Sequence, residues 1–104
     1  MKILFIGDIV GRIGRRIVKE KLPYFVEKYG IDFVIANGEN ATHGKGLIRH
    51  QYDELIEACI DVVTLGNHYD SKNELARYIN FVDRLVRPAN LIKDYPGEGS
   101  ATFD

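Results

Sequence analysis

The order of apolar and polar segments limits the folds that are open to this chain. Three short apolar runs, at residues 3–6, 33–36 and 62–65, alternate with segments at 12–29 and 47–60 whose apolar positions recur at helical spacing. Continuous apolar runs of this length are typical of strands covered on both faces. Strands that alternate with helices predict an α/β fold of order βαβαβα. Right-handed crossovers then give a mainly parallel sheet between helices.

Local signals refine this expectation. Pro23 should kink the first helix or start a second one, and Gly30 is a candidate C-terminal cap. Residues 71–74, Ser-Lys-Asn-Glu, have the form of a capping box that opens a short helix. Residues 82–86 fit either the end of that helix or a short strand, whereas residues 100–103 begin to look like a strand.

Size and composition favour one small globular domain. With 104 residues, 45% of them hydrophobic and 28% charged, we expect residues 1–104 to form a single domain. The apparent strand at 100–103, where the sequence stops, suggests that this domain is truncated. The net charge of −1 predicts no stable binding to nucleic acid and none to a membrane. Cys59 has no partner for an intramolecular disulfide and is expected to be a buried thiol in a cytoplasmic protein. Arg12, Arg15 and Arg16 are expected to form a solvated helix face.

Each apolar run ends in polar side chains that can bind a metal. Asp8 follows the first run, Glu39 and Asn40 follow the second, and Asn67 and His68 follow the third. The carboxyl ends of parallel strands meet at one edge of the sheet, where open α/β folds bind their ligands. Carboxylates, amide oxygens and imidazole suit divalent metals, and a pair of ions roughly 3.5–4 Å apart can promote phosphoester hydrolysis. The alternative is that these residues are ordinary solvated loop acids and turn formers.

The loop at residues 37–46 is a second candidate for function, because it is long for a connection between a strand and a helix. His43 and Lys45 in this loop are candidate substrate contacts, with exposed surface residues as the alternative. Tyr69 follows the third strand exit. It is expected either to stack on a base or to pack against the neighbouring loop.

Four motifs together carry a resemblance to a known family. They are Gly-Asp-Ile-Val-Gly at 7–11, Asn-Gly-Glu-Asn-Ala-Thr-His-Gly-Lys-Gly at 37–46, Gly-Asn-His at 66–68 and Arg-Pro-Ala-Asn at 87–90. In this order they resemble the N-terminal half of the YmdB-type branch of calcineurin-like metallophosphoesterases. The resemblance implies a partial calcineurin-like phosphoesterase fold and a phosphodiesterase acting on cyclic nucleotides, including the 2′,3′-cyclic type. It also implies two divalent metal ions, with iron or manganese expected before magnesium.

The resemblance assigns roles residue by residue. It makes Asp8 a ligand of the first metal, Glu39 the bridging carboxylate, and Asn40 and Asn67 ligands of the second metal. His68 becomes the proton donor to the leaving oxygen, with a structural histidine as the alternative. Members of the family are longer, and histidines in their second half complete both metal shells.

The expected partner is a small-molecule phosphodiester or cyclic nucleotide, and a homo-oligomer is expected because a thin sheet exposes an edge strand. A different hypothesis makes the chain a non-catalytic fragment that acts as an oligomerisation or interaction module and binds metal weakly.

Overall fold

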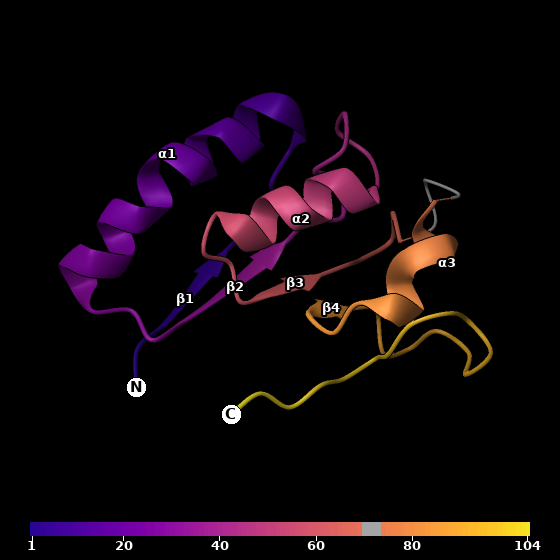
Figure 1. The fold of residues 1–104 in the computed structure, drawn as a ribbon. Helices are drawn as coiled ribbons and strands as arrows, with labels where there is room; N and C mark the ends of the chain where they lie inside the picture. Colours follow the sequence, from indigo (N-terminus) through magenta and orange to yellow (C-terminus); the bar gives the residue numbers. More distant parts are fainter. Residues whose placement is uncertain (70–73) are drawn as a thin grey trace.

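The computed structural model describes residues 1–69 and 74–104, and Figure 1 shows how their helices and strands are arranged. The strands are β1 (Ile3–Ile6), β2 (Phe33–Asn37), β3 (Val62–Thr64) and β4 (Leu85–Val86). The helices are α1 (Gly11–Tyr29), α2 (Arg49–Glu57) and α3 (Leu75–Tyr78), and a 3-10 turn, η1 (Ile79–Phe81), follows α3. No helix in residues 1–69 or 74–104 has the length and apolar character needed to cross a bilayer.

The strands form one parallel sheet in the order β1-β2-β3-β4. The register places Ile3 beside Phe33 and Ala36 beside Val63. This arrangement confirms the α/β class and the parallel sheet. The ambiguous segment at 82–86 is a strand in part, because Leu85–Val86 pairs with β3.

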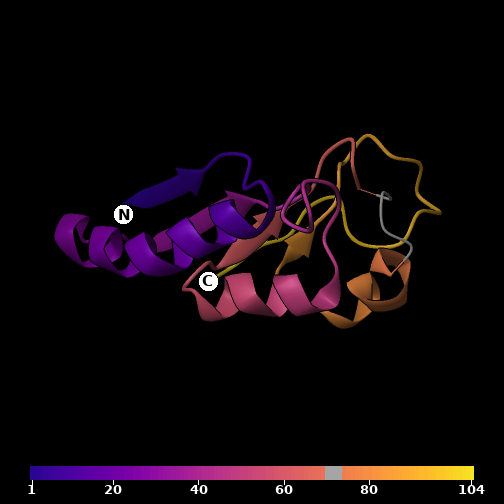
Figure 2. The ribbon, with the colours of Figure 1, turned by 90° about the horizontal axis from the view of Figure 1, so that it is seen from above.

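The helical cover of the sheet lies on one face. Each strand is added on the same side of the one before it, so right-handed crossovers place α1 and α2 on a common face, as Figures 1 and 2 show. On the opposite face Ile3 and Phe5 remain 56% and 59% exposed. Phe103 contacts that face through the Phe33 ring, with ring centroids 5.7 Å apart.

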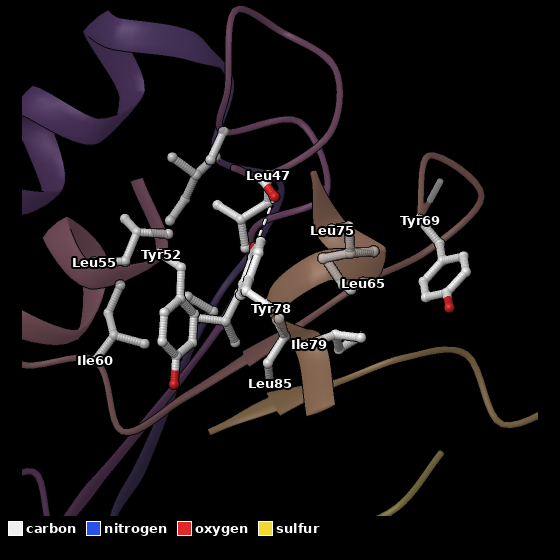
Figure 3. Packing of buried hydrophobic residues seen from close by; sticks show 14 of the residues in the cluster. Leu47, Tyr52, Leu55, Ile60, Leu65, Tyr69, Leu75, Tyr78, Ile79 and Leu85 are labelled. Carbon is white, nitrogen blue, oxygen red and sulfur yellow. Dashed lines mark hydrogen bonds between the residues drawn. The ribbon is translucent and has the colours of Figure 1, made fainter. Parts of the chain in front are cut away.

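The core lies between the sheet, α2 and the segment from α3 to β4 (Figure 3). Leu47, Leu55 and Val63 are among its fully buried side chains. The Tyr78 hydroxyl donates a hydrogen bond of 2.7 Å to the Leu47 carbonyl oxygen, which joins α3 to the loop before α2. Burial raises the pKa values of Tyr52 and Tyr78 because a phenolate is disfavoured away from water.

Some local predictions were confirmed and others were wrong. Gly30 is the left-handed cap of α1, with φ 60°. Helix α1 continues through Pro23, so no second helix starts there. Residues 100–104 form no strand, because Phe103 packs across the sheet face instead of pairing with an edge. Cys59 is exposed and not buried: it lies just past α2 with φ 83°, which turns it out of the helical pattern.

The predicted capping box lies largely outside the described residues, since 71–73 are not among them. Its last residue, Glu74, is described and has a different partner. Its carboxylate accepts a hydrogen bond of 2.7 Å from the Arg49 N–H at the start of α2. A negative charge at this position stabilises the first turn of the helix.

Candidate active site at the strand ends

Backbone hydrogen bonds hold the loops that leave the first three strands against one another. The Ile9 N–H donates to the Asn37 carbonyl oxygen at 3.2 Å, and the Gly11 N–H donates to the Asn40 carbonyl oxygen at 3.0 Å. The Gly38 N–H donates to the Thr64 carbonyl oxygen at 2.9 Å. Gly11 takes a left-handed φ of 62°, which suits glycine best. The positions of the polar side chains are therefore fixed by main-chain contacts.

Four of the predicted site residues form one continuous network. The Asn40 side-chain amide donates to both carboxylate oxygens of Asp8, at 2.9 and 3.1 Å. The Asn40 side-chain oxygen accepts a short hydrogen bond from His68 Nδ1. The His68 backbone N–H donates to Glu39 Oε2 at 2.9 Å, and Nδ1 lies 3.8 Å from the same oxygen. Side chains from three strand ends thus come together, as the sequence predicts.

Glu39 is positioned by a glycine at the next strand end. A Cβ atom added to Gly66 would lie 2.1 Å from Glu39 Oε1, so a larger residue at this position would force the carboxylate to move. Asn37 Nδ2 donates to the same oxygen at 3.3 Å. The side chain of Glu39 is 14% exposed. The carboxylate is therefore largely buried, with Asn37 donating to one oxygen and the His68 N–H to the other.

Arg15 is a site residue that the sequence analysis assigned wrongly. It was expected on a solvated face, but it is 8% exposed and its Nη1 donates to the Ala41 carbonyl oxygen, next to Asn40. Its Nε lies 3.6 Å from Glu54 Oε1 on α2. The arginine thus joins α1, the loop after β2 and α2. Helical spacing alone does not reveal this role, because the loop that receives the arginine has no periodic pattern.

Thr42 is a second anchor that the sequence analysis did not single out. It is 2% exposed, and its hydroxyl accepts from the Ile48 N–H at 3.0 Å and donates to Gln51 Oε1 at 3.1 Å. These bonds attach the loop to the start of α2. The position of Thr42 two residues after Asn40 gives no distinctive signal in the sequence.

The remaining predicted residues lie apart from the network. Asn67 is exposed and, within residues 1–69 and 74–104, makes no hydrogen bond to the four network residues; it lines a neighbouring cavity. Tyr69 lies in the wall of the same cavity, is 6% exposed and donates from its hydroxyl to the Pro96 carbonyl oxygen at 2.6 Å. His43 and Lys45 lie in the loop after β2, and both are exposed. His43 has a left-handed φ of 49°.

The donor types fit a divalent metal, but the charged ligand set is sparse. In the part of the chain that the structure describes, no group of three or more His, Cys, Asp or Glu side chains is gathered as a metal site. Carboxylate oxygens of Asp8 and Glu39 and the amide oxygen of Asn40, which keeps a second lone pair, are suitable ligands for hard cations. A metal here would depend on amide and water ligands as well as on the two carboxylates.

The structure is that of a parallel α/β protein in which polar side chains gather at the carboxyl ends of the strands. The model of the family described as YmdB-like protein matches residues 4–104. The chain therefore belongs to this family, and the resemblance seen in the four sequence motifs is confirmed.

Relatives and solved structures agree with this assignment. The chain is 50% identical over 99 residues to the 2′,3′-cyclic-nucleotide 2′-phosphodiesterase of Bacillus subtilis, covering 95% of this chain and 38% of that protein. It resembles the crystal structure of a novel phosphatase from Mycoplasma pneumoniae, with a TM-score of 0.90, 43% identity, and coverage of 100% of this chain and 38% of the other. A hypothetical protein from Thermus thermophilus gives a TM-score of 0.86 at 44% identity, covering 95% of this chain and 38% of that one. The chain thus spans about 38% of the length of these proteins.

Proposed function

We propose that the strand-end network is the metal-binding part of a phosphodiesterase that hydrolyses cyclic nucleotides, of the 2′,3′-cyclic type, with two divalent metal ions. The observation that carries the proposal is the continuous path from Asp8 through Asn40 and His68 to Glu39. The relative from Bacillus subtilis, named as a 2′,3′-cyclic-nucleotide 2′-phosphodiesterase, supports the choice of substrate. Iron or manganese is the preferred pair of ions, with magnesium as the alternative.

The residues divide the work between binding and proton transfer. Glu39, Asp8, Asn40 and Asn67 would hold the ions. When bound, the ions supply Lewis-acid polarisation of the phosphoryl group and a nucleophile at neutral pH. Asn40 also orients the His68 ring by accepting from Nδ1. Protonated imidazole donates from both nitrogens, so Nε2 can give its proton to the leaving oxygen.

The test combines metal content with turnover. Purified protein is measured by elemental mass spectrometry and assayed with adenosine 2′,3′-cyclic monophosphate, beside Glu39→Ala and a control, Glu27→Ala, at an exposed position on α1. We expect about two ions per chain and metal-dependent hydrolysis, both lost in Glu39→Ala and kept in Glu27→Ala. Hydrolysis that is unaffected by Glu39→Ala, or that survives exhaustive chelation, would refute the proposal.

A second candidate function is assembly with another copy of the chain. Strand β1 forms an edge of the sheet, and Ile3 and Phe5 leave an apolar surface beside that edge. Exposed apolar edges favour pairing with a further strand, so β1 of a second copy is the proposed partner. Sedimentation analysis should then show a dimer that Phe5→Glu dissociates. A clean monomer of the unmodified protein removes this candidate.

We place either function in the cytoplasm. Cys59 is the sole cysteine in the sequence, so the fold depends on no internal disulfide, as is usual in reducing compartments.

A further inference from the structure

A cavity of about 440 Å³ lies beside the strand-end network. It opens between the ends of β3 and β4 and the loop of residues 88–96. Its lining includes Asn67, Tyr69, Pro88, Asn90, Leu91 and Tyr95. The volume falls in the range of about 300–1,000 Å³ that small-molecule sites occupy. Because Asn67 adjoins His68 in the chain, a ligand that reaches from the network into the cavity would occupy both.

The cavity wall is preformed. The Tyr69 ring meets the Tyr95 ring edge to face, with centroids 6.1 Å apart and an interplanar angle of 88°. Figure 3 shows Tyr69 at one end of the core cluster, with its hydroxyl turned toward the C-terminal segment, where it donates to the Pro96 carbonyl oxygen. Arg87, which is 8% exposed, closes the base of the loop by donating to the Gly97 and Pro88 carbonyl oxygens at 3.1 and 2.8 Å.

The chemistry of the lining matches a flat heteroaromatic ring with polar edges. Tyr95 is 42% exposed and lines the same wall as Leu91, so the two together offer an aromatic ring and an apolar side chain to a planar ligand. Asn90 carries one amide donor group and one carbonyl acceptor, the combination that pairs with the edge of a nucleobase. A phosphate alone would use neither the rings nor the apolar wall.

We propose that this cavity binds the nucleobase of the cyclic nucleotide whose phosphate is held at the strand-end network, with Tyr95 as the stacking residue. The proposal rests on the proposed function for the position of the phosphate. It adds a base subsite made of the β3 exit and the loop of residues 88–96. Tyr69 is a positioning residue in this site, because its ring and hydroxyl fix the loop that carries Tyr95.

Binding is tested on metal-loaded protein that carries His68→Gln, which lacks the proton donor to the leaving oxygen, so that turnover does not interfere. The probes are adenosine 2′,3′-cyclic monophosphate and the base-free methyl β-D-ribofuranoside 2′,3′-cyclic phosphate. Tyr95→Ala should weaken the binding of adenosine 2′,3′-cyclic monophosphate about tenfold, since stacking on one aromatic ring contributes that much to the binding of a base. The binding of the base-free cyclic phosphate should be unchanged. Tyr95→Phe should restore the affinity. Tyr29→Ala removes a tyrosine of similar exposure, 49%, on α1 and serves as the matched control.

A titration with adenosine, which carries no phosphate, separates this proposal from the proposed function. Nuclear magnetic resonance should show shifts of the Leu91 and Tyr95 amide signals, weakened by Asn90→Ala, whether or not the chain hydrolyses a diester. Equal affinity for the two cyclic phosphates, equal effects of Tyr95→Ala and Tyr29→Ala, or the absence of adenosine-induced shifts at these amides would each overturn the base subsite.

Discussion

Replacing Arg15 with alanine should lower the free energy of unfolding far more than replacing its neighbour Arg16. Arg15 is 8% exposed, donates to the Ala41 carbonyl oxygen and lies 3.6 Å from Glu54. Arg16 pairs with Glu20 at 3.1 Å, but the two side chains are 74% and 53% exposed. The pair of variants compares the same residue type in the same helix in two different environments.

The expected loss of stability in Arg15→Ala follows from the interactions that the arginine side chain makes. A buried hydrogen bond to a charged donor contributes about 1.5–3 kcal/mol, and the aliphatic part of the Arg15 side chain adds packing. Glu54 is 22% exposed and regains water, so the loss stays below the roughly 3–5 kcal/mol of a fully buried broken pair. We therefore expect Arg15→Ala to lower the free energy of unfolding by about 2–3 kcal/mol. Arg16→Ala should lower it by under about 0.5 kcal/mol, because solvent screens the ion pair of Arg16.

Urea unfolding followed by circular dichroism measures the difference. With a slope of about 1 kcal/mol/M for a small domain, the Arg15→Ala midpoint should fall by roughly 2–3 M, and that of Arg16→Ala by less than about 0.5 M. Arg15→Met keeps the aliphatic stem and separates packing from charge. Equal midpoints for Arg15→Ala and Arg16→Ala, or full stability in Arg15→Met, would refute the assigned role of the guanidinium.

Three further changes test other contacts. Burial raises the pKa of Tyr78 above its ordinary 10.0, so its contribution to stability is complete below about pH 10 and is lost as pH rises through the folded-state pKa. Tyr78→Phe should cost about 1 kcal/mol at pH 7 through the lost bond to Leu47, and make the alkaline loss in urea unfolding shallower; an unchanged alkaline slope contradicts this. Gly66→Ala should displace Glu39 and weaken metal binding in calorimetric titration by at least about tenfold, with circular dichroism unchanged. A metal affinity in Gly66→Ala equal to that of the wild type would contradict the inferred contact between position 66 and Glu39. Thr42→Val should lower the thermal midpoint by losing about 1–2 kcal/mol, and Thr42→Ser should recover most of it; equal midpoints for the two would rule out a role for the hydroxyl.

The parallel sheet and the meeting of three strand ends were predictable because both follow from local patterns. Apolar runs identify strands, and parallel pairing brings whatever follows them to one edge, as the contacts of Asn40 with Asp8 and His68 illustrate. The short strand Leu85–Val86 was ambiguous, because a run of two paired residues carries no period of its own.

The burial of Arg15 was not predictable in the same way. Apolar Ile13 and Ile17 continue the helical stripe, yet they are 75% and 54% exposed, whereas Arg15 is buried. Which face of a helix meets a loop depends on tertiary packing. The exposure of Cys59 was also not predictable from the sequence pattern. The helical spacing of apolar residues continues to Cys59, but α2 has already ended and the chain turns there.

The contact between Gly66 and Glu39 makes two positions far apart in the sequence depend on each other. While position 39 carries glutamate, any side chain at position 66 meets its carboxylate and must displace it, so a deep mutational scan read out by metal binding should favour glycine there. Once position 39 is shortened to alanine, alanine or serine at position 66 should cause no further loss of metal binding. The effect of a substitution at position 66 thus depends on the residue at position 39, so the two positions should vary together.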